Sequence, residues 1–141
     1  MRKSTDELMN ILKSKKSYEE FFKEEVSELF FSSITEYINL LITEKKLKKS
    51  TIIRKSNLDK NYAYQIFNGT KTNPSRDKVI MMAFGMELNL VETKKLMAMA
   101  QVKELYVRDP RDSVIIFCIY KQYSLLKTNE FLMDYGLDCL E

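Results

Sequence analysis

The chain has 141 residues, of which 45% are hydrophobic and 30% charged, and its formal net charge is +3. This composition is typical of a folded domain with a hydrophobic core and excludes an intrinsically disordered chain. The sequence contains no histidine, which excludes Ser-His-Asp and Cys-His catalytic sites and histidine-ligated metal sites. We therefore expect a protein that is not an enzyme and that binds no cofactor and no metal.

The sequence also bears on the compartment. No apolar stretch reaches the roughly 18 residues that a membrane-spanning helix needs, and the N-terminal segment is too polar for a signal peptide. The two cysteines, Cys118 and Cys139, lie far apart without metal-ligand spacing, which is typical of reduced thiols. These features predict a cytoplasmic protein without a membrane partner.

Positive charge is concentrated in the middle of the chain. Residues 45–78 carry ten cations and two carboxylates, a net charge of +8, whereas the other residues carry 13 cations and 18 carboxylates, a net charge of −5. Such an asymmetry is typical of a surface that binds a polyanion. The ten cations, which we expect on one continuous face, are Lys45, Lys46, Lys48, Lys49, Arg54, Lys55, Lys60, Lys71, Arg76 and Lys78.

The first part of the chain contains three helix-start patterns in which a serine precedes a glutamate by three residues. In this capping box, the hydroxyl and the carboxylate satisfy backbone N–H groups of the first turn. The pairs are Ser4 with Glu7, Ser17 with Glu20 and Ser33 with Glu36, and they predict helices over residues 5–14, 18–31 and 34–46.

Two short helices are predicted next, over residues 49–56 and 60–68. Asn57 tolerates the left-handed backbone that a tight turn between them requires, and Asp59 is suited to cap the second helix. Gly69 ends that helix, and Pro74 follows in the loop.

The rest of the sequence reads as an internal duplication, because residues 75–105 align without gaps on residues 110–140, at an offset of 35. Each copy has the pattern of a helix, a short turn and a second helix, which predicts two stacked helical hairpins. The identical pairs are Arg76/Arg111, Asp77/Asp112, Val79/Val114, Ile80/Ile115, Leu90/Leu125, Thr93/Thr128 and Leu105/Leu140.

Residues 47–75 combine the features of two short helices joined by a tight turn. They are Leu47, Ile52, the Asn57-Leu58 turn, the run from Lys60 to Ile66, and the closing Asn68-Gly69 and Pro74-Ser75. On these residues the chain resembles the phage-repressor/Cro-like helix-turn-helix proteins, also called the XRE family. The match departs at Ile53, Asn57 and Phe67, where the family usually has alanine, glycine and often glutamate.

The resemblance implies an all-α fold with a lambda-repressor-like five-helix DNA-binding domain over residues 33–105. An N-terminal helical extension would occupy residues 1–32. A C-terminal helical hairpin, which repeats helices 4 and 5 of the domain, would occupy residues 106–141. The recognition helix, which enters the major groove in this family, would be Asp59–Asn68.

The resemblance also assigns site residues by matched position. Lys60, Asn61, Tyr64 and Gln65 would contact base edges in the major groove of duplex DNA. The phosphate contacts would come from the start of the first helix and from the segment after the recognition helix. They are Lys49, Asn68, Thr70, Lys71 and Thr72, followed by Arg76 and Lys78.

The resulting hypothesis is a transcriptional regulator that binds specific double-stranded DNA, as a homodimer because one recognition helix covers only a few base pairs. Apolar residues such as Phe21, Phe22, Phe117 and Phe131 place the expected dimer contacts outside the repressor-like domain. The alternative is a helical interaction adaptor, or an antitoxin-like partner, that retains the helix-turn-helix without DNA binding. Its protein partner would use the C-terminal hairpin.

Overall fold

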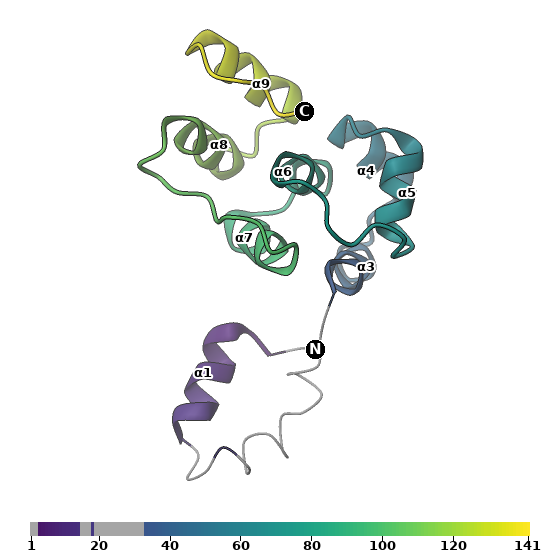
Figure 1. Cartoon of the computed structure of the whole chain (residues 1–141), viewed down its shortest axis with the longest axis vertical. Coiled ribbons are helices and arrows are strands. Elements are labelled where there is room, and N and C mark those ends of the chain that lie inside the picture. Colours follow the sequence, from purple (N-terminus) through teal and green to yellow (C-terminus); the bar gives the residue numbers. More distant parts are fainter. Residues whose placement is uncertain (1–2, 15–17, 19–32) are drawn as a thin grey trace. The chain divides into compact units, whose positions relative to one another are not determined.

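The computed structural model describes residues 3–14, 18 and 33–141, and every regular element in this part of the chain is an α-helix (Figure 1), as expected for the all-α class. The chain divides into two compact units, residues 1–32 and 33–141. The first unit contains α1 (Thr5–Ser14). The second contains α3 (Ile34–Lys45), α4 (Lys49–Ser56), α5 (Lys60–Phe67), α6 (Arg76–Gly85), α7 (Leu90–Met99), α8 (Pro110–Tyr120) and α9 (Leu125–Asp134).

Serine caps begin two of the predicted helices. The Ser4 hydroxyl accepts a hydrogen bond from the backbone N–H of Glu7 at 3.1 Å, and Ser33 accepts one from Glu36 at 3.2 Å. Each cap satisfies an N–H group that has no partner within its own helix. The predictions at residues 5–14 and 34–46 are thereby confirmed, while the one at residues 18–31 falls largely outside the described residues, as do Phe21 and Phe22.

The turn between α4 and α5 has the predicted chemistry. Asn57 adopts the left-handed conformation (φ 54°), and the Asp59 carboxylate accepts a hydrogen bond from the backbone N–H of Tyr62 at 3.1 Å. Leu58 between them is 5% exposed and anchors the turn in the core. The C-terminal end of α5 is held by α3, where Thr35 and Asn39 donate side-chain hydrogen bonds to the last carbonyl groups of α5. The turn and the Asp59 cap therefore hold the start of α5, and the hydrogen bonds from α3 hold its end.

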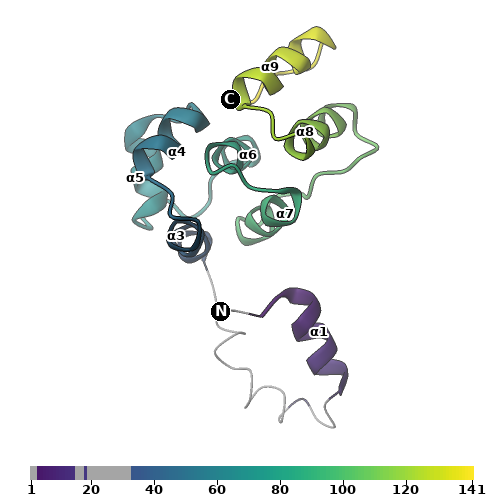
Figure 2. The ribbon, with the colours of Figure 1, turned by 180° about the vertical axis from the view of Figure 1, so that it is seen from behind.

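α6 lies at the centre of the second unit, between α4 and α8–α9 (Figures 1 and 2). Its last residue, Gly85, allows the backbones of α4 and α6 to approach closely. A Cβ atom at this position would lie 2.6 Å from the carbonyl oxygen of Ile52 and 2.6 Å from Cβ of Ser56. α4 is thus packed directly against the first hairpin, α6–α7.

The two hairpins, α6–α7 and α8–α9, share a backbone plan at the offset of 35 residues. The turn residues Glu87 and Gln122 occupy equivalent positions and both have a positive φ, 55° and 59°. Thr93 and Thr128, also equivalent, each donate a 2.8 Å hydrogen bond to the carbonyl oxygen of the residue that caps their helix. The duplicated pattern in the sequence thus corresponds to two hairpins with matching helix and turn positions.

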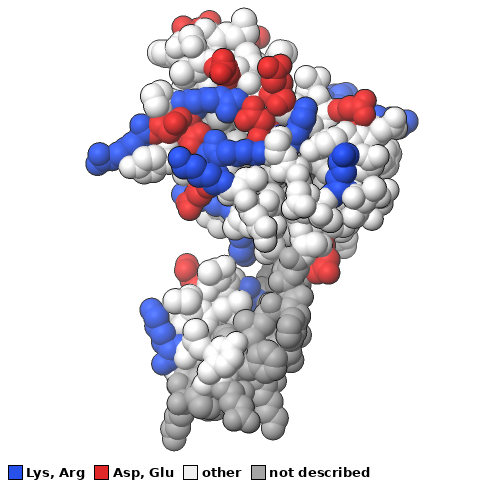
Figure 3. Space-filling view, in the orientation of Figure 1, with Lys and Arg blue, Asp and Glu red and all other residues white. Residues whose placement is uncertain are grey.

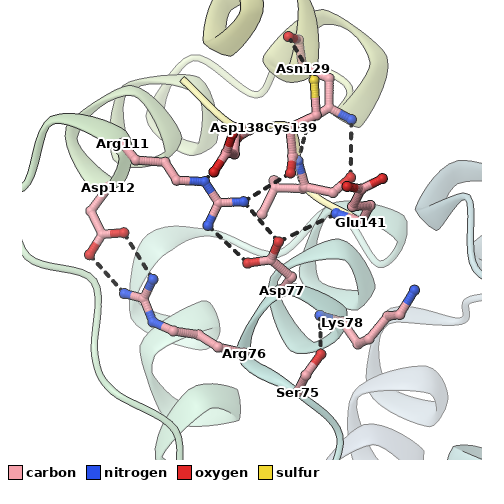
Figure 4. A network of polar contacts seen from close by, with 11 residues as sticks. Ser75, Arg76, Asp77, Lys78, Arg111, Asp112, Asn129, Asp138, Cys139 and Glu141 are labelled. Atoms are coloured by element: carbon pink, nitrogen blue, oxygen red, sulfur yellow. Dashed lines mark hydrogen bonds and ion pairs between the residues drawn. The ribbon is translucent and has the colours of Figure 1, made fainter. Parts of the chain in front are cut away.

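Reciprocal ion pairs join the two hairpins (Figure 4). Arg76 donates to both carboxylate oxygens of Asp112, at 2.7 and 3.0 Å, and Arg111 donates to both oxygens of Asp77, at 2.8 and 2.9 Å. Each copy therefore gives its arginine to the aspartate of the other copy. Reciprocal contacts of this kind characterise an isologous, two-fold interface, so α6–α7 and α8–α9 are related by a local pseudo-two-fold axis.

Backbone groups complete this symmetric arrangement. Arg76 also donates to the carbonyl oxygens of Lys103 and Glu104, at 2.8 and 3.2 Å. The equivalent bonds from Arg111 reach Asp138 and Cys139, at 2.9 and 3.0 Å. The segment that follows each hairpin is therefore tied to the arginine at the start of that hairpin.

Candidate nucleic-acid interface

The outward face of α5 carries the predicted base-contacting residues. Lys60, Asn61 and Tyr64 are exposed, and Gln65 is half-buried. They alternate with Ala63 and Ile66, which are 0% and 1% exposed, so the apolar stripe of the helix faces the core and the polar stripe faces outward. The helix is long enough to present all four side chains, and its N-terminal end is capped by Asp59.

The loop after α5 folds back on the helix. The Asn68 side chain accepts a hydrogen bond from the backbone N–H of Thr70 at 2.9 Å, and the N–H of Lys71 donates to the carbonyl of Gln65 at 3.0 Å. Lys71 and Thr72 remain exposed in this loop. The Asn68 oxygen is thus already used within the loop, while the side chains of Lys71 and Thr72 are accessible to a ligand.

Tyr62 organises the cations of this surface. The ammonium groups of Lys71 and Lys78 lie 5.7 and 5.8 Å from the centre of its ring. Burial raises the pKa of Tyr62, so the ring remains neutral and can hold both lysines by cation–π contacts. Tyr62 is not among the residues that the sequence assigned to DNA contacts, yet it lies beside two of the predicted phosphate contacts, Lys71 and Lys78.

The start of α4 offers backbone donors next to Lys49. The cap residue Lys48 makes no side-chain cap hydrogen bond, so no side chain caps the first N–H groups of α4. The Lys49 ammonium lies 5.5 Å from the centre of the Phe67 ring, at the end of α5. Phe67 itself is 4% exposed and forms an edge contact with Tyr64. A cation and N–H groups with no side-chain cap therefore lie together at one edge of the candidate surface.

Arg76 occupies a different place from the other predicted phosphate contacts. Its guanidinium is engaged with Asp112 and with two backbone carbonyl groups, and its side chain is 24% exposed. The identical pairs Arg76/Arg111 and Asp77/Asp112 in the duplicated sequence were the pattern that could have revealed this arrangement. We therefore assign Arg76 to the junction between the hairpins and not to the candidate interface.

Both aspartates of the junction titrate abnormally. Burial by itself would raise the pKa of Asp77, but hydrogen bonds and charge from Arg111 outweigh it and hold the pKa below its ordinary value. Burial likewise opposes ionisation of Asp112, where Arg76 and the backbone N–H of Tyr106 lower the pKa. Both carboxylates are thus ionised at neutral pH and hold their arginines in fixed positions.

Several cations of residues 45–78 form ion pairs with acidic side chains. Lys45 pairs with Glu92 and Lys55 with Glu87, in addition to the pair between Arg76 and Asp112. On the face shown in Figure 3, positive and negative side chains are interleaved. The expectation that all ten cations form one continuous basic face is therefore wrong for these three, because acidic residues from the hairpins reach them.

The described residues also bear on metal sites, membrane-spanning helices and disulfide bonds. Among the described residues, no cluster of cysteine, aspartate or glutamate could hold a metal ion, and no helix is long and apolar enough to cross a membrane. Cys118 and Cys139 are free thiols. Comparison with protein-family models, with curated proteins and with solved structures found no match to this chain.

Proposed function

We propose that the chain is a transcriptional regulator that binds specific double-stranded DNA through α5, within a lambda-repressor-like arrangement of α3–α7. The observation that carries the proposal is the outward stripe of Lys60, Asn61 and Tyr64 on a capped helix whose opposite side is buried. An α-helix fits the major groove of B-DNA, where amide and ammonium groups can pair with base edges. The protein would act in the cytoplasm, as a homodimer that binds paired half-sites.

Affinity would come from the groups that flank α5. Lys49 with the N-terminal end of α4 lies at one edge, and Lys71 with Lys78 lies beside Tyr62 at another. Phosphate contacts of this kind position a protein on the duplex without selecting a sequence. Thr70 and Thr72, exposed in the same loop, would add hydroxyl donors. The groups that would select a DNA sequence thus lie on α5, and the groups that would attract the phosphates electrostatically lie around it.

This division of roles is tested by two substitutions, measured by titration of a selected site and of random duplex at several salt concentrations. Gln65→Ala removes an amide that can pair with adenine, and should cost about 1–3 kcal/mol on the selected site while leaving random duplex nearly unchanged. Lys71→Ala should weaken binding to both duplexes alike and lower the salt slope by about one ion.

Lys103→Ala is the matched control, because it removes an exposed lysine outside the candidate surface. It should change neither binding nor the salt slope by more than a small long-range amount. Equal losses for Gln65→Ala on selected and random DNA would show that the assigned orientation of α5 is wrong.

The alternative, an interaction adaptor or antitoxin-like partner without DNA binding, is favoured by a different observation. The second hairpin exposes large apolar side chains, among them Phe117 and Tyr135, at 45% and 71%. An adaptor would bind its partner there and would show no salt-dependent affinity for duplex DNA. Unchanged DNA binding in both Gln65→Ala and Lys71→Ala would favour this alternative.

A further inference from the structure

The outer faces of the two hairpins differ in what covers them. α3 and α4 pack against the first hairpin, α6–α7. The outer residues of this hairpin are at most 5% exposed, and they are Val79, Met82, Leu96 and Ala100. The equivalent positions in α8–α9 are Val114, Phe117, Phe131 and Tyr135. They line an open apolar groove together with Pro110 and Leu137. The second hairpin thus exposes the face that the first hairpin buries.

The exposed face is built from aromatic side chains. Tyr123 stacks on Phe131 with ring centres 5.8 Å apart, and Phe117 lies 6.1 Å from both rings. The rings support one another and form a preorganised surface, which lowers the entropic cost of association. A face of this kind is characteristic of protein–protein contacts, where aromatic residues are enriched.

A helix cannot pack on α8–α9 as closely as α4 packs on α6–α7. The residue equivalent to Gly85, which allows the close approach of α4, is Tyr120, and its side chain is 77% exposed. The aromatic surface therefore requires a partner that meets it at the distance of packed side chains. A second copy of the same aromatic face has that property.

The charges along α9 also suit a second copy. Lys127 and Asp134 are both exposed and lie seven residues, or about two helical turns, apart on one stripe, with Phe131 between them. The ammonium groups of Lys121 and Lys127 lie 5.7 Å from the centre of the Phe117 ring and 3.8 Å from the centre of the Tyr123 ring, so this end of the aromatic face is positively charged. When two α9 helices cross in opposite directions near Phe131, each Lys127 meets the Asp134 of the other copy.

We propose that two copies of the chain pair through the aromatic faces of their α8–α9 hairpins, about a two-fold axis near Phe131, with the two α9 helices antiparallel. The proposal gives a surface to the homodimer named under the proposed function, and it does not require DNA binding. The interface is isologous, because the basic end of each hairpin meets the acidic end of its partner.

Sedimentation equilibrium of the full chain without DNA tests the pairing. The chain should be a dimer at tens of micromolar. Lys127→Glu and Asp134→Lys should each weaken dimerisation by roughly tenfold, because each single change places like charges together twice per dimer. The double variant should restore dimerisation to within about threefold of the original, since it exchanges the two charges.

Both residues are exposed, and the Lys127 ammonium also lies 3.8 Å from the centre of the Tyr123 ring, so circular dichroism is used to verify that each variant keeps its fold. Lys60→Glu, on α5, is the matched control: it should reduce DNA binding and leave the dimer unchanged, which separates a failure of this proposal from a failure of the proposed function. A chain that is still monomeric at about 100 µM, where an interface of ordinary size is formed, would overturn the proposal. So would a dimer that Lys127→Glu does not weaken or that the double variant does not restore.

Discussion

The hairpins α6–α7 and α8–α9 share helix positions, turn conformations and paired arginines, yet they differ in their outer faces. The first hairpin has Gly85 and Ala100 where the second has Tyr120 and Tyr135. Small residues allow α4 to pack directly on the first hairpin, and aromatic residues leave the second with an exposed surface. One backbone plan can thus bury its outer face or expose it, depending on a few side-chain volumes.

The largest difference between the two copies is expected at Gly85 and its counterpart Tyr120. Gly85→Ala should lower the free energy of unfolding by about 2–3 kcal/mol, because the added Cβ meets the backbone and side chain of α4. Tyr120→Ala, at an exposed position, should change it by no more than about 0.5 kcal/mol. Urea unfolding at low protein concentration measures both, and a mild effect of Gly85→Ala would contradict the close approach of α4 and α6.

The reciprocal ion pairs should be unequal despite their symmetry. The side chain of Asp112 is 4% exposed and that of Asp77 is 24% exposed, so solvent screens the second pair more. We expect Asp112→Asn to cost about 3 kcal/mol, since it leaves Arg76 without its buried partner. Asp77→Asn should cost about 1 kcal/mol. Equal losses in thermal or urea unfolding would show that exposure does not control these pairs.

The free energy of unfolding is expected to fall gradually in acid. The pKa values of Asp77 and Asp112 are lowered in the folded protein from an ordinary value of 3.8. Their stabilisation is therefore complete above that value and is lost as the pH falls through the folded pKa. The free energy of unfolding, measured from about pH 6 to the acid limit of folding, should decline below about pH 4. The double variant Asp77→Asn/Asp112→Asn should show a shallower decline over the same range.

The smallest difference in stability loss between the two hairpins is expected where the hairpins agree most closely. Thr93→Val and Thr128→Val each remove a buried hydroxyl that donates to a capping residue, and each should cost about 1 kcal/mol. The two losses should differ by only about 0.3 kcal/mol, because the two hydrogen bonds have the same length and equivalent partners. A larger difference in urea unfolding would indicate that the second hairpin has a distinct local packing.

Much of the fold was predictable because its determinants are local. Ser33 caps α3, Asn57 takes the left-handed turn conformation and Asp59 caps α5, all as their side-chain chemistry predicts. The gapless repeat placed the four hairpin helices for the same reason, since caps and apolar spacing repeat together. The alternation of outward and buried positions on α5 also follows from helical periodicity.

The exchange of partners between the hairpins was not predictable from local patterns. Arg76 is followed directly by Asp77, and the recurrence of this pair at Arg111 and Asp112 marks the positions without saying which residue each one contacts. The structure pairs each with a residue about 35 positions away, because a two-fold relation brings the two helix starts together. The ion pairs of Lys45 and Lys55 were not predictable for the same reason, since Glu92 and Glu87 reach them from elements distant in sequence.

The exchange of arginines has a consequence for dissecting the protein into modules. A chain cut after residue 105 would lose Asp112, the partner of Arg76, and Arg111, the partner of Asp77, in a single step. It would also expose the surface of α6 that contacts α9. We therefore expect such a truncation to destabilise the remaining helices α3–α7, and not only to remove α8 and α9.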